Sequence, residues 1–536
     1  MNDNPPKKIS LKSQSAWILS AKIIGFGFSF LLPLLVVRFL NKDEVGTYRQ
    51  VFLIIINANT IFTLGFGMSA YYYLPRETSR RSAVIFNTLL FNFVMGGLVC
   101  FALGLFPSLV GSIFQSEEIT RLAPKIGIVI WFWMFSSFLE IVAVANQEPK
   151  MATAFIVLTQ FTKTALLVLG VMLFTSVESL VYAAMLQAML QSIILIVYLN
   201  ARFPRFWTTF DAKFFREQLF YALPFGLSGL IWTLQTDVHN YFVGYRFSAA
   251  EFAIYAIGCF QLPLIGMLGE SVAAVLIPRI SSLQATGDRA EIIRLTIRAA
   301  QKLSFFYFPI YIFLMITAET FITTLFTRDY TASVPIFLVN LTLLPIWIWV
   351  TDPIVRAYKE LGRYLLLLRL FILPVMTAVL YYGMQHFDMR GIIGIVVVTT
   401  VTEKIIFTAV ITKKLNVERR DLGGLRTVGK TAAAALTAGF FTYLFYWKFA
   451  GRILLWGADW SQMIFAAPKK GLVDFFAGSS VLAFSALIFV PLYLLGANFF
   501  GIIEDEEKEK VKEILRKIFR RDVVRVSTPA FQSKNE

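Results

Sequence analysis

Eight ionisable side chains interrupt the long apolar runs of this sequence. Four are cations and four are anions: Lys22, Lys163, Arg369 and Lys404, and Glu140, Asp237, Glu270 and Glu403. A charge held inside hydrocarbon costs roughly 3 kcal/mol or more unless it is paired or hydrated, so each position is a candidate functional site. A lysine gains nothing by facing lipid. The embedded cations therefore indicate an anionic solute that reaches the middle of a membrane.

The four cations differ in how well a simpler explanation fits them. Lys163 follows Lys150 by more than three helical turns, which places it near the centre of a bilayer. Lys22 also fits snorkelling toward the inner interface, and Arg369 lies only about two turns inside its helix. Glu140 and Glu270 fall near the ends of their apolar runs, where hydration is sufficient to explain them.

Two close pairs leave alternatives open. Asp237 and His239 fit either a structural hydrogen-bonded pair or a titratable ion site. Glu403 and Lys404 are adjacent and point to different sides of a helix, so each is a candidate for charge pairing with a neighbouring helix. With two histidines and two cysteines, we expect no disulfide framework, no metal centre and no cofactor.

The composition requires lipid as the solvent of these elements. Of 536 residues, 57% are hydrophobic and 16% are charged, and the mean hydropathy is +0.66. Soluble chains average about 25% charged residues. A soluble enzyme is therefore excluded.

Apolar blocks of membrane-crossing length, about 20 residues, predict fourteen transmembrane helices. They cover residues 17–39, 46–73, 84–106, 126–145, 153–174, 180–199, 221–244, 252–277, 303–326, 334–355, 364–383, 392–412, 432–447 and 475–500. The stretch 448–470 is expected to be the longest outer loop. The fold class is an all-α polytopic membrane protein.

The net charge of +16 is concentrated in alternate loops. Basic residues crowd residues 76–81, 202–216, 279–302, 356–363 and 413–430, whereas loop 177–179 has none. By the positive-inside rule, both termini are cytoplasmic, which an even number of spans allows. The basic excess thus reflects topology, and we expect no nucleic-acid partner.

An internal repeat divides the chain. Arg38, Glu44 and Tyr48 precede a Leu-Pro-Arg sequence, and Arg246, Glu251 and Tyr255 precede Ile-Pro-Arg in the same order. Six helices per copy give both copies the same orientation, a parallel repeat around a central path. The predicted units are an N-terminal lobe (1–199), a cytoplasmic linker (200–217), a C-terminal lobe (218–415), two extra helices (416–500) and a basic amphipathic cytoplasmic tail (501–536). Pro224 is the best hinge candidate.

With these features the sequence resembles the multidrug/oligosaccharidyl-lipid/polysaccharide (MOP) exporter superfamily, and within it the Wzx-type polysaccharide and O-antigen flippases. The resemblance lies in the order and spacing of short segments, at residues 44–51, 64–76, 273–294, 325–333 and 357–364. It covers most of the two lobes but not the last two helices.

The resemblance implies a two-lobed bundle that exposes a central cavity alternately to each side of a bacterial inner membrane. It implies that the cargo is a polyprenyl-(pyro)phosphate-linked oligosaccharide, flipped to the outer leaflet for cell-surface polysaccharide biosynthesis. Lys22, Lys163 and Arg369 would then hold the phosphates. Membrane lipids and other polysaccharide assembly proteins are the further expected partners, and no covalent catalysis is needed.

The energy source stays open. In similar proteins, an Asp of the seventh helix contributes to a sodium site with polar residues of helices eleven and twelve. Asp237 lies in the matching helix, with His239 nearby, and Thr399 and Thr400 lie in helix twelve. Helix eleven has Arg369 and no Asn or Asp, which puts a sodium site in doubt and leaves proton coupling or a salt bridge.

Two other functions compete with this prediction. A cation-coupled multidrug exporter of the same superfamily would expel organic cations, and the embedded lysines argue against it. A polysaccharide polymerase or ligase is expected to carry a large outer loop with catalytic Arg or His, and stretch 448–470 has no His.

Overall fold

The computed structural model describes residues 11–77, 79–465, 470–503 and 509. Within these residues every regular element is a helix, and eleven helical segments are long and apolar enough to cross a membrane. The α-helices are α1 (Leu11–Phe39), α2 (Lys42–Phe62), α3 (Met68–Tyr73), α4 (Arg81–Leu105), α5 (Ser108–Phe114), α6 (Glu117–Ser136), α7 (Phe138–Ala145), α8 (Pro149–Phe174), α9 (Val177–Arg202), α10 (Ala212–Arg246), α11 (Ala249–Gly258), α12 (Pro263–Thr286), α13 (Arg289–Phe326), α14 (Val334–Leu341), α15 (Asp352–Ala357), α16 (Lys359–His386), α17 (Met389–Leu415), α18 (Leu425–Ile464) and α19 (Lys470–Phe499).

The fourteen predicted spans all coincide with helices. Eleven qualify on length and apolarity alone, and the other three are α2 with α3, α10 and α18. Several spans consist of two helices in succession, because the chain breaks at residues 63–67 between α2 and α3 and at 259–262 between α11 and α12. At the first break, Leu64 and Gly65 adopt positive φ angles of 46° and 64°.

The internal repeat is visible in local structure. α2 begins with a capping box formed by Asn41 and Glu44, and α11 begins with one formed by Ser248 and Glu251. In each box the cap side chain accepts a backbone N–H, and the glutamate accepts the N–H of the cap residue. Glu44 and Glu251, which mark the repeat in the sequence, thus do the same structural work in both copies.

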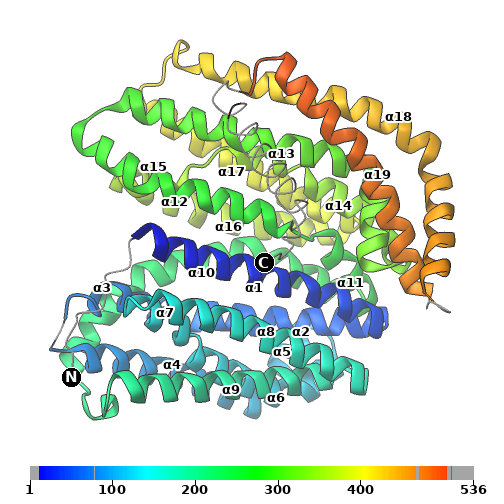
Figure 1. The fold of residues 1–536 in the computed structure, drawn as a ribbon. Helices are drawn as coiled ribbons and strands as arrows, with labels where there is room; N and C mark the ends of the chain where they lie inside the picture. The colour runs from blue at the N-terminus through cyan, green and yellow to red at the C-terminus, as the bar shows by residue number, and fades with distance from the viewer. Residues whose placement is uncertain (1–10, 78, 466–469, 504–508, 510–536) are drawn as a thin grey trace, which may run out of the picture.

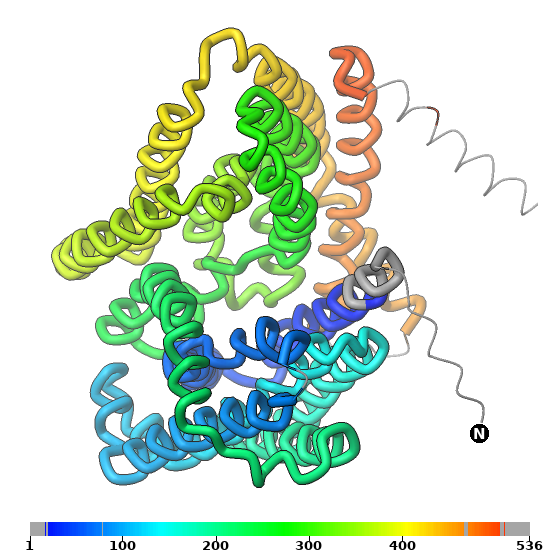
Figure 2. The backbone as a smooth tube through the Cα atoms, turned by 90° about the vertical axis from the view of Figure 1, so that its left-hand side faces the viewer, coloured from blue at the N-terminus to red at the C-terminus, as the bar shows by residue number. Residues whose placement is uncertain are grey.

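The helices gather into two layers. In Figure 1, α2–α9 form the lower layer and α12–α17 the upper one, with α1 and α10 between them and α18 and α19 along the right-hand side. Figure 2 shows both layers from the end at which α3 and α15 lie. We call α1–α9 the first lobe and α10–α17 the second lobe. The end of the molecule at which α3, α15 and the Lys- and Arg-rich loops lie is called the basic end.

The buried apolar residues show how the lobes meet. At the end opposite the basic end, one continuous core takes residues such as Val51 and Ile126 from the first lobe and Ala253 and Leu314 from the second. At the basic end the cores are separate: one lies within α3, α4, α7–α9 and the start of α10, and the other within α12, α13 and α15–α17. The lobes are therefore joined at one end and packed independently at the other.

The joined end depends on a close helix approach. A Cβ atom on Gly46 of α2 would lie 1.8 Å from the carbonyl oxygen of Ala249 in α11, so only glycine fits there. Asp43 accepts a hydrogen bond from the backbone N–H of Ala250, at 3.2 Å. Arg38, at the end of α1, donates to the carbonyl oxygens of Thr324 and Leu325 in α13, at 3.0 and 2.9 Å.

Two sequence expectations need correction. The expected outer loop 448–470 is wrong in its larger part, because α18 continues without interruption to Ile464. The expected linker 200–217 is shorter, since α9 extends to Arg202 and α10 begins at Ala212. Phe203 and Phe206 between them are buried against the first lobe. The predicted tail (501–536) lies outside the described residues except for residues 501–503 and 509.

Candidate functional site

The first lobe holds a polar centre around Lys163 of α8. The Lys163 ammonium nitrogen lies 4.4 Å from the ring centroid of Trp133 in α6. The indole N–H of Trp133 in turn donates to Oε1 of Gln187 in α9, at 2.8 Å. We call Trp133, Lys163 and Gln187 the first-lobe centre.

No carboxylate among the described residues forms an ion pair with Lys163. The Lys163 side chain is partly exposed. The face of an indole ring attracts a cation, but it carries no net charge. Gln187 is buried and its amide nitrogen is used in a bond to Gln191, at 2.9 Å. The first-lobe centre therefore keeps a net positive charge within the span.

The second lobe holds a polar centre of different charge. Arg369 of α16 forms an ion pair with Glu403 of α17, with 3.0 Å between Nε and Oε1. Gln235 of α10 donates its amide N–H to the other oxygen of Glu403. The guanidinium carbon of Arg369 lies 4.5 Å from the ring centroid of Trp232, also in α10. We call Trp232, Gln235, Arg369 and Glu403 the second-lobe centre.

The four residues of this centre carry no net charge, although the Lys404 cation interacts electrostatically with Arg369 and Glu403, and the centre has an unused acceptor. Glu403 is 8% exposed and Gln235 is 6% exposed. Because the Gln235 amide nitrogen faces a carboxylate, its orientation is fixed, and its oxygen is buried with no hydrogen-bond partner. Sequence reasoning missed Trp232 and Gln235. Their spacing of three residues on α10 places them on one face, which was the available signal.

The proposed coupling residues face different helices. The Asn57 side chain of α2 lies beside the carboxylate of Asp237 and donates to the hydroxyl of Tyr241, at 3.0 Å. His239 instead shares a hydrogen bond of 2.8 Å between Nδ1 and the hydroxyl of Tyr255. Asp237 therefore faces the first lobe across the interface between the lobes, and His239 faces the second lobe.

Of the other sequence candidates, Lys22 and Glu140 lie away from both centres, whereas Lys404 lies beside the second-lobe centre. Lys22 is exposed on α1, where Glu140 of α7 interacts with it electrostatically. Lys404 donates to the Thr351 hydroxyl at 3.2 Å. In the part of the chain that the structure describes, no hydrogen bond joins Asp237 to Thr399 or Thr400. No group of three His, Cys, Asp or Glu residues there could hold a metal ion.

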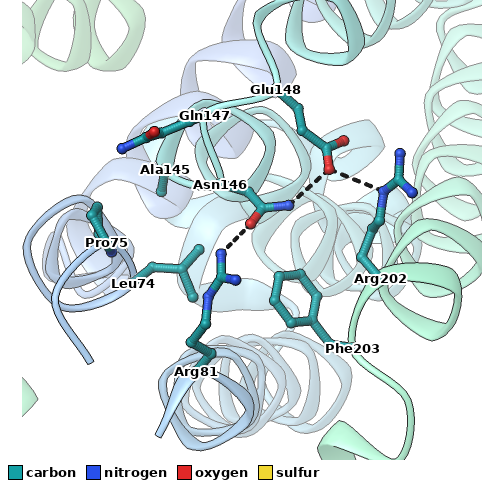
Figure 3. A pocket seen from close by; sticks show the side chains of 9 residues that line it. All are labelled: Leu74, Pro75, Arg81, Ala145, Asn146, Gln147, Glu148, Arg202 and Phe203. Atoms are coloured by element: carbon teal, nitrogen blue, oxygen red, sulfur yellow. Dashed lines mark hydrogen bonds and ion pairs between the residues drawn. The ribbon is translucent and has the colours of Figure 1, made fainter. Parts of the chain in front are cut away.

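A separate hollow of about 490 Å³ lies at the basic end of the first lobe (Figure 3). Arg81 donates to the side-chain oxygen of Asn146, whose amide nitrogen donates to Glu148 at 3.0 Å. Arg202 pairs with the same carboxylate oxygen of Glu148 at 3.0 Å. This network connects the ends of α4, α8 and α9, away from both polar centres.

Solved structures of low sequence identity share the fold. The structure titled "Lipid II flippase MurJ, inward closed conformation" aligns with a TM-score of 0.66 at 13% identity, over 91% of this chain and 98% of that one. An outward-facing multidrug resistance MATE transporter of the MOP superfamily aligns with a TM-score of 0.55 at 16% identity, over 76% and 97%. A MOP superfamily transporter from Pyrococcus furiosus aligns with a TM-score of 0.51 at 17% identity, over 76% and 96%.

No curated protein sequence matches the chain. A family model described as "Polysaccharide biosynthesis protein" matches residues 35–335, which is more than half of the 536 residues and runs from the end of α1 to the start of α14. The chain therefore belongs to this polysaccharide biosynthesis family and has the fold of a MOP superfamily transporter.

Proposed function

We propose that this protein flips a polyprenyl-(pyro)phosphate-linked oligosaccharide from the cytoplasmic to the outer leaflet by alternating access. The family and the fold support a flippase of the MOP type. The observation that carries the substrate class is Lys163, a cation without an acidic partner within a span. A flippase must hide a charged headgroup from hydrocarbon, and an uncompensated cation offers that headgroup a partner.

Lys163 is the principal phosphate ligand in this proposal. Lys22 is exposed on α1, the helix that packs against α8, and it meets the headgroup closer to the basic end. Arg369 is the weakest of the three candidates, because Glu403 already neutralises it. In this proposal, the phosphate-binding surface therefore belongs to the first lobe.

The arrangement of cores supports an alternating-access cycle. The positive-inside rule assigns the basic end to the cytoplasm. The shared core then closes the outer side, and the independent cores of the lobes leave the inner side as the side of loading. Opening the outer side requires separation of α2 from α11 and of Arg38 from α13.

Helix α10 connects the two lobes mechanically. Near the basic end, Gln218 accepts a hydrogen bond from Asn87 of α4 at 2.8 Å. Beyond Pro224, the same helix bonds Glu403 through Gln235 in the second lobe. Pro224 lies between Gln218 and Gln235 and removes one backbone hydrogen bond of the helix. We therefore expect α10 to bend at Pro224.

Ion coupling is proposed at Asp237, at the interface between the two lobes. A carboxylate at Asp237 faces α2 through Asn57, so binding of a proton or a sodium ion there changes a contact between lobes. Thr399 and Thr400 are proposed as further ligands of the ion only in a conformation in which they lie closer to Asp237. Transport with a sodium gradient and with a proton gradient, each imposed alone on liposomes, separates the two ions.

The first test is mass spectrometry of lipids that copurify with the protein in mild detergent. The variants are Lys163→Glu and, as a matched charge reversal, Lys448→Glu at an exposed position of α18. A polyprenyl-phosphate glycan should be present in the wild type and in Lys448→Glu, and absent in Lys163→Glu. Retention of that lipid by Lys163→Glu contradicts the assignment, and a bound organic cation instead indicates the multidrug exporter.

A further inference from the structure

We propose that the second-lobe centre is a saccharide subsite, so that the two lobes divide the cargo: phosphates on the first lobe and the adjoining sugar on the second. This inference rests on the proposed function and assigns the sugar-recognising residues within it. The residues are Trp232, Gln235, Arg369 and Glu403. They come from α10, α16 and α17.

The pairing of Arg369 with Glu403 argues against a phosphate on Arg369. Arg369 and Glu403 form a close pair with side chains 20% and 10% exposed. A phosphate that engaged Arg369 would draw it away from Glu403 and leave a buried carboxylate without its cation, which is strongly unfavourable. A neutral ligand leaves the pair intact.

Hydrogen-bond polarity points the same way. The buried group without a hydrogen-bond partner at this centre, among the described residues, is the oxygen of Gln235, which can only accept. An ionised phosphate offers acceptors and no donor to meet it. A sugar hydroxyl or an acetamido N–H supplies the missing donor, and a buried acceptor left unpaired costs free energy that such a ligand recovers.

The aromatic residue completes the set. Trp232 is 39% exposed, and Arg369 lies against its ring. A large aromatic surface beside a few fixed polar groups is the usual lining of a small-molecule site. The apolar C–H face of a pyranose packs against such a ring while its hydroxyls reach Gln235 and Glu403. An organic cation would also meet the ring, but Arg369 already occupies a place against it and repels a second positive charge.

The test measures the affinity of the full-length protein in nanodiscs for two probes. One is undecaprenyl pyrophosphate, and the other is undecaprenyl-pyrophosphoryl-N-acetylglucosamine. We expect wild type to bind the sugar-bearing lipid about tenfold more tightly, a difference of about 1.4 kcal/mol. Gln235→Met and Trp232→Ala should remove this preference and leave the affinity for undecaprenyl pyrophosphate unchanged.

Two further variants keep the result interpretable. Trp232→Phe retains an aromatic face and should retain most of the preference, which separates ligand stacking from loss of fold. Lys163→Gln should lower the affinity for both lipids by the same factor. Equal weakening of both lipids by Trp232→Ala, or a wild type without any preference, overturns the saccharide subsite. Wild type that binds neither lipid overturns the proposed function itself.

Discussion

The two polar centres use similar parts with one difference of charge. In the first lobe, a cation on the fifth span, Lys163, lies over a tryptophan that bonds Gln187 on the sixth. In the second lobe, a cation on the fifth span, Arg369, lies over a tryptophan and pairs with Glu403 on the sixth. A neutral amide in one lobe and a carboxylate in the other leave one centre positive and one neutral. The difference lies in the partner on the sixth span of each lobe, which leaves Lys163 without an ion pair among the described residues and gives Arg369 one.

The largest expected effect is on the neutral centre. Glu403→Leu leaves Arg369 without its anion in a span and should lower the free energy of unfolding by about 3–5 kcal/mol. Thermal unfolding in detergent measures the loss. The double variant Glu403→Leu with Arg369→Met removes both charges and should recover most of the stability. A single variant as stable as wild type would show that the ion pair does not matter for folding.

Charge reversal of the positive centre comes next. Lys163→Glu exchanges an attraction for a repulsion and should reduce glycan export at least about a hundredfold, which corresponds to about 3 kcal/mol. The amount of folded protein should stay near wild type, because Lys163 has no acidic partner to strand. Export in cells that lack the native protein gives the measurement, with Lys448→Glu as the control. Normal export by Lys163→Glu would remove this residue from the mechanism.

The helical elements could be predicted from the sequence far better than the partners of the charged side chains. Hydropathy is local along the chain, so the spans could be predicted, and the repeat marked by Glu44 and Glu251 could be read from the order of residues. The pairing of Arg369 with Glu403 and Gln235 joins residues on three helices, and no spacing in one helix reveals it. Lys163 could be recognised as a cation within a span, but its contact with the ring of Trp133 could not.

The errors in the fold also have local causes. Polar residues such as Asp459 and Ser461 lower the hydropathy of the second half of α18, so a helix that continues past the apolar block looked like a loop. The breaks in the second and eighth spans were missed because the residues at 63–67 and 259–262 carry no charge and, apart from Gln261, are apolar or small. Hydropathy reports the lipid environment, not the continuity of backbone hydrogen bonds.

A smaller effect is expected when the amide of one centre and the carboxylate of the other are exchanged. Gln187→Glu brings a carboxylate to the tryptophan that supports Lys163, and should weaken binding of undecaprenyl pyrophosphate about tenfold. Glu403→Gln in the other lobe should strengthen it, because Arg369 loses its compensating charge. Native mass spectrometry of the two variants gives both affinities. Changes of the same sign would mean that the two centres do not differ in the way their charges indicate.

The smallest effect is expected from the aromatic platform. Trp133→Leu removes the cation–π contact, worth about 1 kcal/mol at a partly exposed site, and leaves the charge in place. Affinity for undecaprenyl pyrophosphate should fall only about fivefold, less than in Lys163→Gln. A loss as large as that of Lys163→Gln would show that Trp133 fixes the position of the ammonium group and does more than stabilise it.

The most direct test of the central claim is flipping by purified protein in liposomes. A fluorescent undecaprenyl-pyrophosphoryl-N-acetylglucosamine is followed from one leaflet to the other, for wild type and for Lys163→Gln. The positive centre of the first lobe predicts rapid flipping by wild type and a rate near that of protein-free liposomes for Lys163→Gln. Equal rates for the two proteins would contradict the claim that this cation carries the phosphate headgroup across the membrane.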